Sequence, residues 1–214
     1  MIPRNMVFLL SVLLILTSGC STKRESLGSD NEIIVIASIE DQEDIRDVLE
    51  IIFSDTLYTP EPESFYKIKF VNPKGFKNLK RQTNLAVASI GDDLLNPGTR
   101  LVKNLLGKDR YEETIHGSEH FILTENQFAN GQLFMVLSGQ SKEDIIQDVR
   151  GKAKWVKSRF NENFNRKQKK FLFDQMRRKD VEEKFMKKYQ WSLNIPWGWE
   201  IIKENPDSNW IWLG

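Results

Sequence analysis

The sequence has 214 residues, of which 40% are apolar and 29% are charged, and its formal net charge is +1. This composition is typical of globular proteins and excludes collagen-like, low-complexity and disordered classes. A chain of this length buries enough surface to fold without a disulfide or metal staple. Its single cysteine excludes a disulfide framework and any zinc site built from several cysteines.

The amino terminus has the pattern of an export signal. Arg4 precedes an apolar run over 7–16 of about ten residues, whereas a membrane-spanning helix needs about 20. The small residues at 17–19 precede the lone Cys20 and resemble the lipobox of bacterial lipoproteins. The resemblance implies that residues 1–19 are a signal peptide and that Cys20 becomes lipidated, so the protein is tethered to a membrane through a lipid anchor. A plain secretory signal with an incidental cysteine is the alternative.

Residues 20–31 are predicted to form a lipidated cysteine followed by a flexible tether. The segment STKRESLGSDN is polar and has no apolar periodicity with which to bury itself. Eleven flexible residues reach about 18 to 20 Å, which is enough to hold a domain just off a bilayer. Ser21 is not aspartate, which by analogy with lipoprotein sorting in enterobacteria favours the outer membrane.

The first half of the folded part alternates strand and helix signals. Residues 33–39 are mostly β-branched and predict a strand, and the apolar residues of 45–52 follow at helical spacing. The prolines and glutamates of 59–63 break this pattern before an alternating strand over 66–70. Residues 85–90 are apolar or small throughout, which predicts a strand covered on both faces.

The second half is dominated by a long helix. A loop over 92–98 and a brief helix over 101–106 precede a strand over 132–137. Ser141, three residues before Asp144, is typical of a helix start. Apolar side chains then recur on one face over about five turns; they are Ile145, Val149, Ala153, Val156, Phe160 and Phe164.

Helical spacing continues over about 167–189 with a bend near Lys179, and two short strands at 199–203 and 210–213 flank a turn. Strands that alternate with helices predict an α/β (α+β) fold, in which a mixed β-sheet is packed by helices that include one long basic helix. We expect a single domain of this kind over residues 32–214.

Several segments together resemble the amino-terminal part of an uncharacterised family of bacterial envelope lipoproteins, known as a domain of unknown function. They are the cysteine site, EIIVIAS, PEPESF, NPKGF before NLAVASI, NQFANGQLFMVLSGQ, NIPWGWEI and NWIWL. They span nearly all of the chain after residue 19. The resemblance implies relatives that continue beyond residue 214, and it brings no catalytic residues because none are established for the family.

The segment HGSEH matches the H-x-x-E-H pattern of inverted zinc peptidases through His116, Glu119 and His120, with Glu200 at a tolerable distance for a third ligand. Zinc binding of this type needs both imidazoles on one face of a helix. The residues between them, a glycine and a serine, are poor helix formers, and a strand-like run follows. The sequence therefore favours a solvated loop, and we expect no metal and no cofactor.

Five of the six tryptophans lie near the carboxyl end, at Trp191, Trp197, Trp199, Trp210 and Trp212. Five exposed rings would exceed the apolar patch of roughly 300 to 600 Å² found on typical soluble monomers. We therefore expect them to form a core layer under the basic helix. The alternatives are a binding platform for a glycan or a protein partner, and a surface that a further part of the family fold covers.

Residues 151–188 hold 14 basic and 5 acidic side chains. Such a segment is usually a solvated helix face, with contact to anionic lipid or glycan as the alternative. Nucleic acid is not expected as a partner outside the cytoplasm. Because no catalytic constellation stands out, we expect a lipid-anchored envelope protein that acts as a non-enzymatic interaction or binding module. A hydrolase of envelope polymers that uses carboxylates the sequence does not single out is the alternative.

Overall fold

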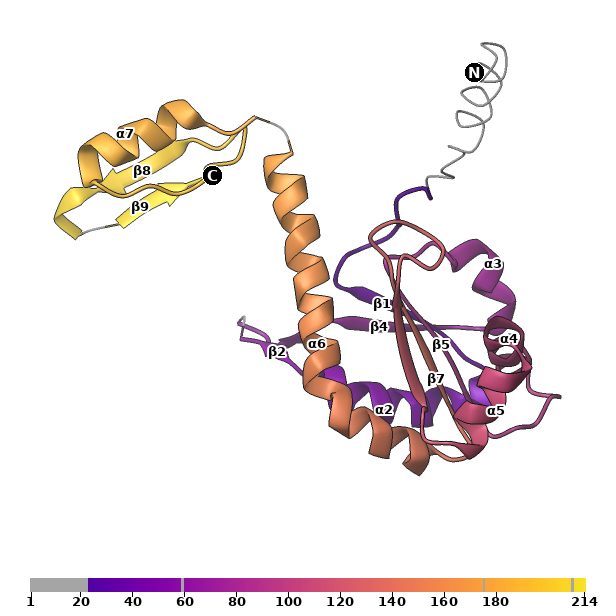
Figure 1. Ribbon diagram of the computed structural model, residues 1–214. Helices are drawn as coiled ribbons and strands as arrows, with labels where there is room; N and C mark the ends of the chain where they lie inside the picture. The colour runs from indigo at the N-terminus through magenta and orange to yellow at the C-terminus, as the bar shows by residue number, and fades with distance from the viewer. Residues whose placement is uncertain (1–22, 59, 175, 209) are drawn as a thin grey trace, which may run out of the picture.

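The computed structural model describes residues 23–214 except 59, 175 and 209, so the predicted signal peptide and Cys20 lie outside the described residues. Its centre is a five-stranded sheet in the order β4-β1-β5-β7-β6 (Figure 1). The strands are β1 (Glu32–Ile36), β4 (Lys67–Val71), β5 (Asn84–Ile90), β6 (Phe121–Glu125) and β7 (Leu133–Gly139). Only β6 runs antiparallel to its neighbour in this sheet.

Helices cover both faces of the sheet. They are α2 (Gln42–Phe53), α3 (Phe76–Leu79), α4 (Pro97–Leu106), α5 (Lys108–His116) and α6 (Lys142–Phe173). Val35 and Met135 pack with α2 and α6 on one face. Ile34 and Val136 pack with α3, α4 and α5 on the other. The mixed sheet and its helical layers confirm the predicted α+β fold, and we call this part of the chain the sheet domain.

The long helix α6 begins where the sequence indicated. Ser141 accepts a hydrogen bond from the backbone of Asp144, whose side chain in turn accepts from the backbone of Ser141, a reciprocal capping box. Instead of a second helix starting near residue 167, α6 continues to Phe173, and α7 (Lys179–Tyr189) begins after a break. A short hairpin of β2 (Thr56–Leu57) and β3 (Glu63–Ser64) lies beside the sheet domain.

The residues after α6 form a compact unit, which we call the C-terminal motif (177–214). It contains α7 and an antiparallel hairpin of β8 (Ile201–Asn205) and β9 (Trp210–Leu213). Val181, Phe185 and Ile195 form its buried centre, separate from the two clusters of the sheet domain. Figure 1 shows the motif beyond the carboxyl end of α6, away from the sheet.

The tryptophans therefore do not form a core layer under the basic helix, and this expectation is wrong. Along β9, Ile211 and Leu213 pack against the α7 cluster. Successive side chains of a strand point to opposite faces, so Trp210 and Trp212 lie on the face of β9 opposite to Ile211 and Leu213. The five clustered tryptophans are between 40% and 59% exposed.

The described part of the predicted tether is also ordered on the sheet domain. Residues 25 and 27 form isolated bridges with Asn130 and Gln82. Leu27 is the one large apolar side chain of this segment and is half exposed, but the backbone of the segment forms hydrogen bonds with the loops before β5 and β7. This corrects the expectation of a flexible linker for residues 23–31.

Candidate functional site

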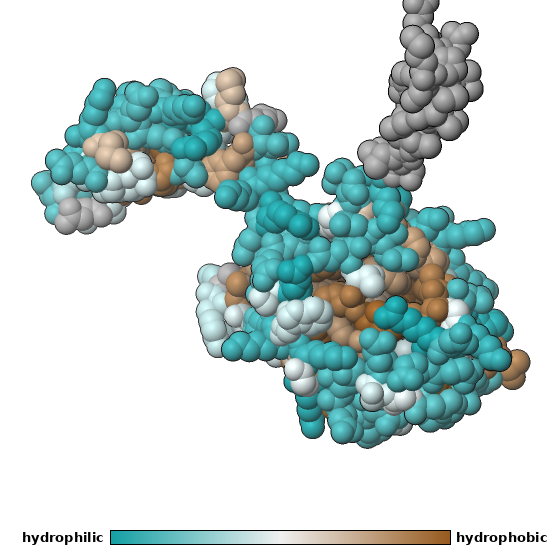
Figure 2. Space-filling view, in the orientation of Figure 1, coloured by the Kyte–Doolittle hydropathy of each residue, from teal (hydrophilic) through white to brown (hydrophobic). Residues whose placement is uncertain are grey.

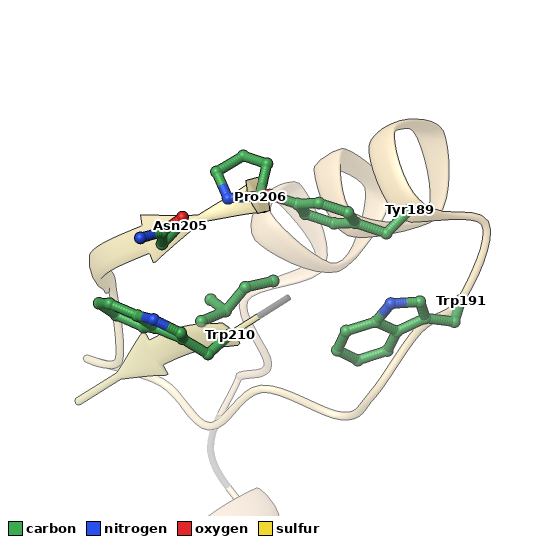
Figure 3. Close-up of a pocket in the computed structure, with 6 residues that line it drawn as sticks. Tyr189, Trp191, Asn205, Pro206 and Trp210 are labelled. Atoms are coloured by element: carbon green, nitrogen blue, oxygen red, sulfur yellow. The ribbon is translucent and has the colours of Figure 1, made fainter. Parts of the chain in front are cut away.

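The C-terminal motif contains an aromatic pocket of about 250 Å³ between the end of α7 and the β8–β9 hairpin. It is lined by Tyr189, Trp191, Asn205, Pro206, Trp210 and Ile211. Figure 3 shows the rings of Trp191 and Trp210 at opposite ends of the cavity. Three rings with different orientations thus surround a space that one small cyclic group would fill.

The local backbone holds these rings in place. Gln190 ends α7 in the left-handed conformation (φ 60°), which turns the chain directly after Tyr189. The ring of Trp191 then packs edge-on against buried Phe185, with 5.2 Å between centroids. Across the pocket, the Asn205 side chain accepts a hydrogen bond from the Ser208 backbone at 3.1 Å, which closes the turn before Trp210.

The pocket carries no free charge. None of the six described residues that line it is ionisable near neutral pH. The nearby carboxylate of Glu204 accepts hydrogen bonds from Lys188 Nζ at 2.6 Å and from the Tyr189 hydroxyl at 2.5 Å. These two donors, Lys188 first, hold the pKa of Glu204 below its ordinary value. The pocket therefore offers a ligand flat aromatic faces and no charged side chain with which an ionic group could pair.

Much of the basic segment is engaged within the protein. Lys157 pairs with Asp55 at 2.5 Å, and Lys152 pairs with Asp148 at 2.7 Å. Further pairs join Arg159 to Glu125 and Glu162, Lys167 to Asp30, Arg177 to Glu182, Arg178 to Asp180 and Lys188 to Glu204. Figure 2 shows a mainly hydrophilic surface over α6. Among the described residues, the basic side chains without an ion pair or hydrogen bond in this segment are Lys154, Lys169, Lys170, Lys179, Lys184 and Lys187.

The two histidines of HGSEH have different environments. His116 is the last residue of α5 and is exposed, with its Nε2 3.6 Å from Glu112. His120 is buried, and its Nδ1 lies 2.8 Å from the Thr114 carbonyl oxygen. The predicted loop thus covers only the residues after His116, because Tyr111 and Ile115 anchor an α5 helix that the sequence analysis missed. In the part of the chain that the structure describes, no group of three or more potential ligands could hold a metal.

Sequence reasoning also missed a partly buried polar cluster at the carboxyl ends of β1 and β5. Ser38 donates a hydrogen bond to Asn96 at 2.6 Å, and Asn96 donates to the Asp41 carboxylate at 3.1 Å. Burial raises the pKa of Asp41. This edge of a parallel sheet often binds ligands, but here these three side chains bond one another and cap the start of α4. The Asn-Pro pair at 96–97 was the available signal, since it is typical of a helix start.

The family model described as "Domain of unknown function (DUF8532)" matches residues 26–172, which is more than half of the chain. The chain belongs to this family. The prediction that the chain contains an uncharacterised domain is therefore confirmed. The DUF8532 match covers the sheet and nearly all of α6, and it ends before the C-terminal motif with its aromatic pocket. No curated protein and no solved structure matches the chain.

The predicted lipidation site, Cys20, lies outside the described residues. Across residues 23–214, apart from the three positions not described, no helix is both long enough and apolar enough to cross a bilayer. In the sequence, only the clustering of tryptophans near the carboxyl end indicated the pocket. Its lining residues come from the end of α7 and from the β8–β9 hairpin, so the cavity itself depends on how these elements pack.

Proposed function

We propose that this protein is a bacterial lipoprotein of the cell envelope, anchored through Cys20 in the outer membrane, and that it acts as a binding module rather than as an enzyme. The signal-like residues 1–19 and the small residues before Cys20 support the anchor. The aromatic pocket of the C-terminal motif is the observation that carries the binding function.

A saccharide is the ligand class that this pocket fits best. The C–H groups on one face of a sugar ring carry partial positive charge, and aromatic faces are electron-rich, so the two stack. Tyr189, Trp191 and Trp210 supply such rings, and the Asn205 amide can bond a sugar hydroxyl or acetamido group. Because no lining residue is charged, a neutral sugar enters without leaving an unpaired buried charge.

The anchor is tested by Cys20→Ala. The variant is expected to move from the washed membrane fraction to the soluble fraction, because it lacks the atom that carries the lipid. Ser21→Ala is the matched control and should remain with the membranes. Retention of Cys20→Ala in washed membranes would contradict lipid anchoring.

The pocket is tested by titrating the unlipidated Cys20→Ala chain with tri-N-acetylchitotriose and following tryptophan fluorescence. We expect saturable quenching that Trp210→Ala weakens at least tenfold. Trp155→Ala is the matched control, since Trp155 is 52% exposed on α6 and lines no part of the aromatic pocket. Quenching that Trp155→Ala removes and Trp210→Ala leaves unchanged would contradict this site.

A further inference from the structure

The amino-terminal segment 23–31 is bound along the edge of the sheet where the parallel strands begin. The backbone N–H of Ser26 donates to Asn130 at 2.9 Å, and the N–H of Leu27 donates to Arg81 at 2.9 Å. In return, the Thr83 N–H donates to the Leu27 carbonyl at 2.8 Å. The segment therefore pairs on both sides, with the loops that lead into β5 and β7.

Two lysines hold this segment at its ends. Lys23 Nζ donates to the carbonyl oxygens of Asn126 and Gln127, at 2.6 and 3.1 Å. Lys167, from the last turns of α6, donates to the hydroxyls of Ser26 at 2.7 Å and Thr83 at 2.8 Å. Lys167 also lies 3.3 Å from the Asp30 carboxylate. Lys23, the first described residue, is thus already held against the sheet domain.

The short distance in sequence between Lys23 and Cys20 limits how far the domain can stand from a membrane. This step rests on the proposed lipid anchor. Three residues span at most about 11 Å when fully extended, whereas an eleven-residue flexible linker reaches about 18 to 20 Å. A lipid on Cys20 therefore holds the starting edge of the sheet directly against the bilayer.

The surface at that edge has the chemistry of a membrane contact. Arg166 and Lys170 are exposed, lie four residues apart on one face of α6 and line the same hollow beside Glu25. Two apolar side chains accompany them, Leu27 at 50% and Phe171 at 81% exposure. With Arg24, these five residues form what we call the amino-edge surface. Its acidic neighbours are Glu25, Asp30 and Asp174, of which Asp30 is paired with Lys167.

We propose that the amino-edge surface docks on the anionic headgroups of the bilayer that carries Cys20. Arg166 and the unpaired Lys170 face the headgroups, and Leu27 and Phe171 enter the interfacial layer. The opposite edge, with Ser38, Asp41 and Asn96, then faces away from the membrane.

The orientation is tested with the lipidated full chain in vesicles that contain anionic lipid. Because lipidation consumes the thiol of Cys20, a single introduced cysteine can carry a fluorophore, at Lys170→Cys or, as the control, at Leu95→Cys on the opposite edge. Headgroup spin-labelled lipid should quench the probe at 170 at least fivefold more than the probe at 95. Equal quenching at both positions would overturn the proposal.

A second arm uses the unlipidated Cys20→Ala chain, so that it does not depend on the anchor. Sedimentation with vesicles of anionic lipid at low salt should fall at least tenfold in Arg166→Glu/Lys170→Glu. Arg150→Glu/Lys154→Glu is the matched control, because it makes the same charge change on exposed residues of the first half of α6. Equal loss in both variants, or no binding by the parent chain, would overturn the docking surface. If cells do not lipidate the chain, the proposed anchor is contradicted. The sedimentation experiment still tests the docking surface, because it uses unlipidated protein.

Discussion

The sheet domain and the C-terminal motif differ in how far they bury large apolar side chains. In the sheet domain, β1 and β5 lie between two layers of helices, and side chains from both of their faces are buried. In the motif, a single helix covers one face of a two-stranded hairpin, and Trp212 on the other face stays 59% exposed. The number of covering layers, more than side-chain hydrophobicity, therefore decides which residues become core.

The two regions also shift the pKa of a buried carboxylate in opposite directions. Asp41 in the sheet domain has a raised pKa because burial outweighs its hydrogen bond from Asn96. Glu182 in the motif has a lowered pKa because Arg177 and the Ile195 backbone N–H donate to it. When ionised, Asp41 thus destabilises the folded sheet domain, whereas ionised Glu182 stabilises the folded motif.

The largest difference is expected for removal of a core ring. Phe160 is fully buried and contacts Phe53 and Tyr66 edge-on, at 4.9 and 5.9 Å between centroids. Phe160→Ala should lower the free energy of unfolding of the sheet domain by about 3 to 5 kcal/mol in urea titrations followed by circular dichroism. Trp212→Ala should change it by less than about 0.5 kcal/mol. Similar losses of stability in the two variants would contradict the difference in burial between Phe160 and Trp212.

A smaller effect is expected for the buried carboxylate of the motif. Glu182→Ala removes an acceptor from Arg177 and leaves the Ile195 N–H without a partner, so it should destabilise the motif by about 2 to 3 kcal/mol. Glu183→Ala, at the exposed neighbouring position, is the control and should be nearly neutral. Tryptophan fluorescence in urea reports mainly on the motif, where five of the six tryptophans lie.

Within the HGSEH segment, one histidine is buried and the other is exposed, so their substitutions should differ in effect. His120→Ala deletes the buried contact to the Thr114 carbonyl and should cost about 1 to 3 kcal/mol of sheet-domain stability. His116→Ala should cost less than about 0.5 kcal/mol, because that side chain is exposed. Elemental analysis of the purified protein should find no stoichiometric zinc. One zinc per chain that is lost in His116→Ala would contradict this assignment.

The smallest expected effect is a pH dependence of opposite sign in the two regions. The lowered pKa of Glu182 stabilises the motif above about pH 4.5, its ordinary value, and this support is lost as the pH falls through the folded-state pKa. The raised pKa of Asp41 acts oppositely, since protonation in mild acid relieves a buried charge and favours the folded sheet domain. Acid titration should therefore change tryptophan fluorescence before circular dichroism. A single shared transition would contradict this.

Most of the fold could be predicted because its signals are local. β1, β5 and β7 are short apolar runs, and α6 carries its cap and its apolar stripe within its own sequence. Helix α5 was missed because it has few apolar residues, of which Tyr111 and Ile115 anchor it. The candidate site could be predicted only as a region rich in tryptophan, since its depth depends on how a helix end meets a hairpin.

The α+β class and the long capped helix could thus be read from the sequence alone, which also predicts a lipidated amino terminus. Only the tertiary structure decided that residues 23–31 are bound rather than flexible, because their partners lie more than 50 residues away, on Arg81, Thr83, Asn130 and Lys167. It likewise decided that the tryptophans stay exposed. Periodicity reports which side chains share a face of a strand, but whether a second layer covers that face depends on packing between elements that are distant in the chain.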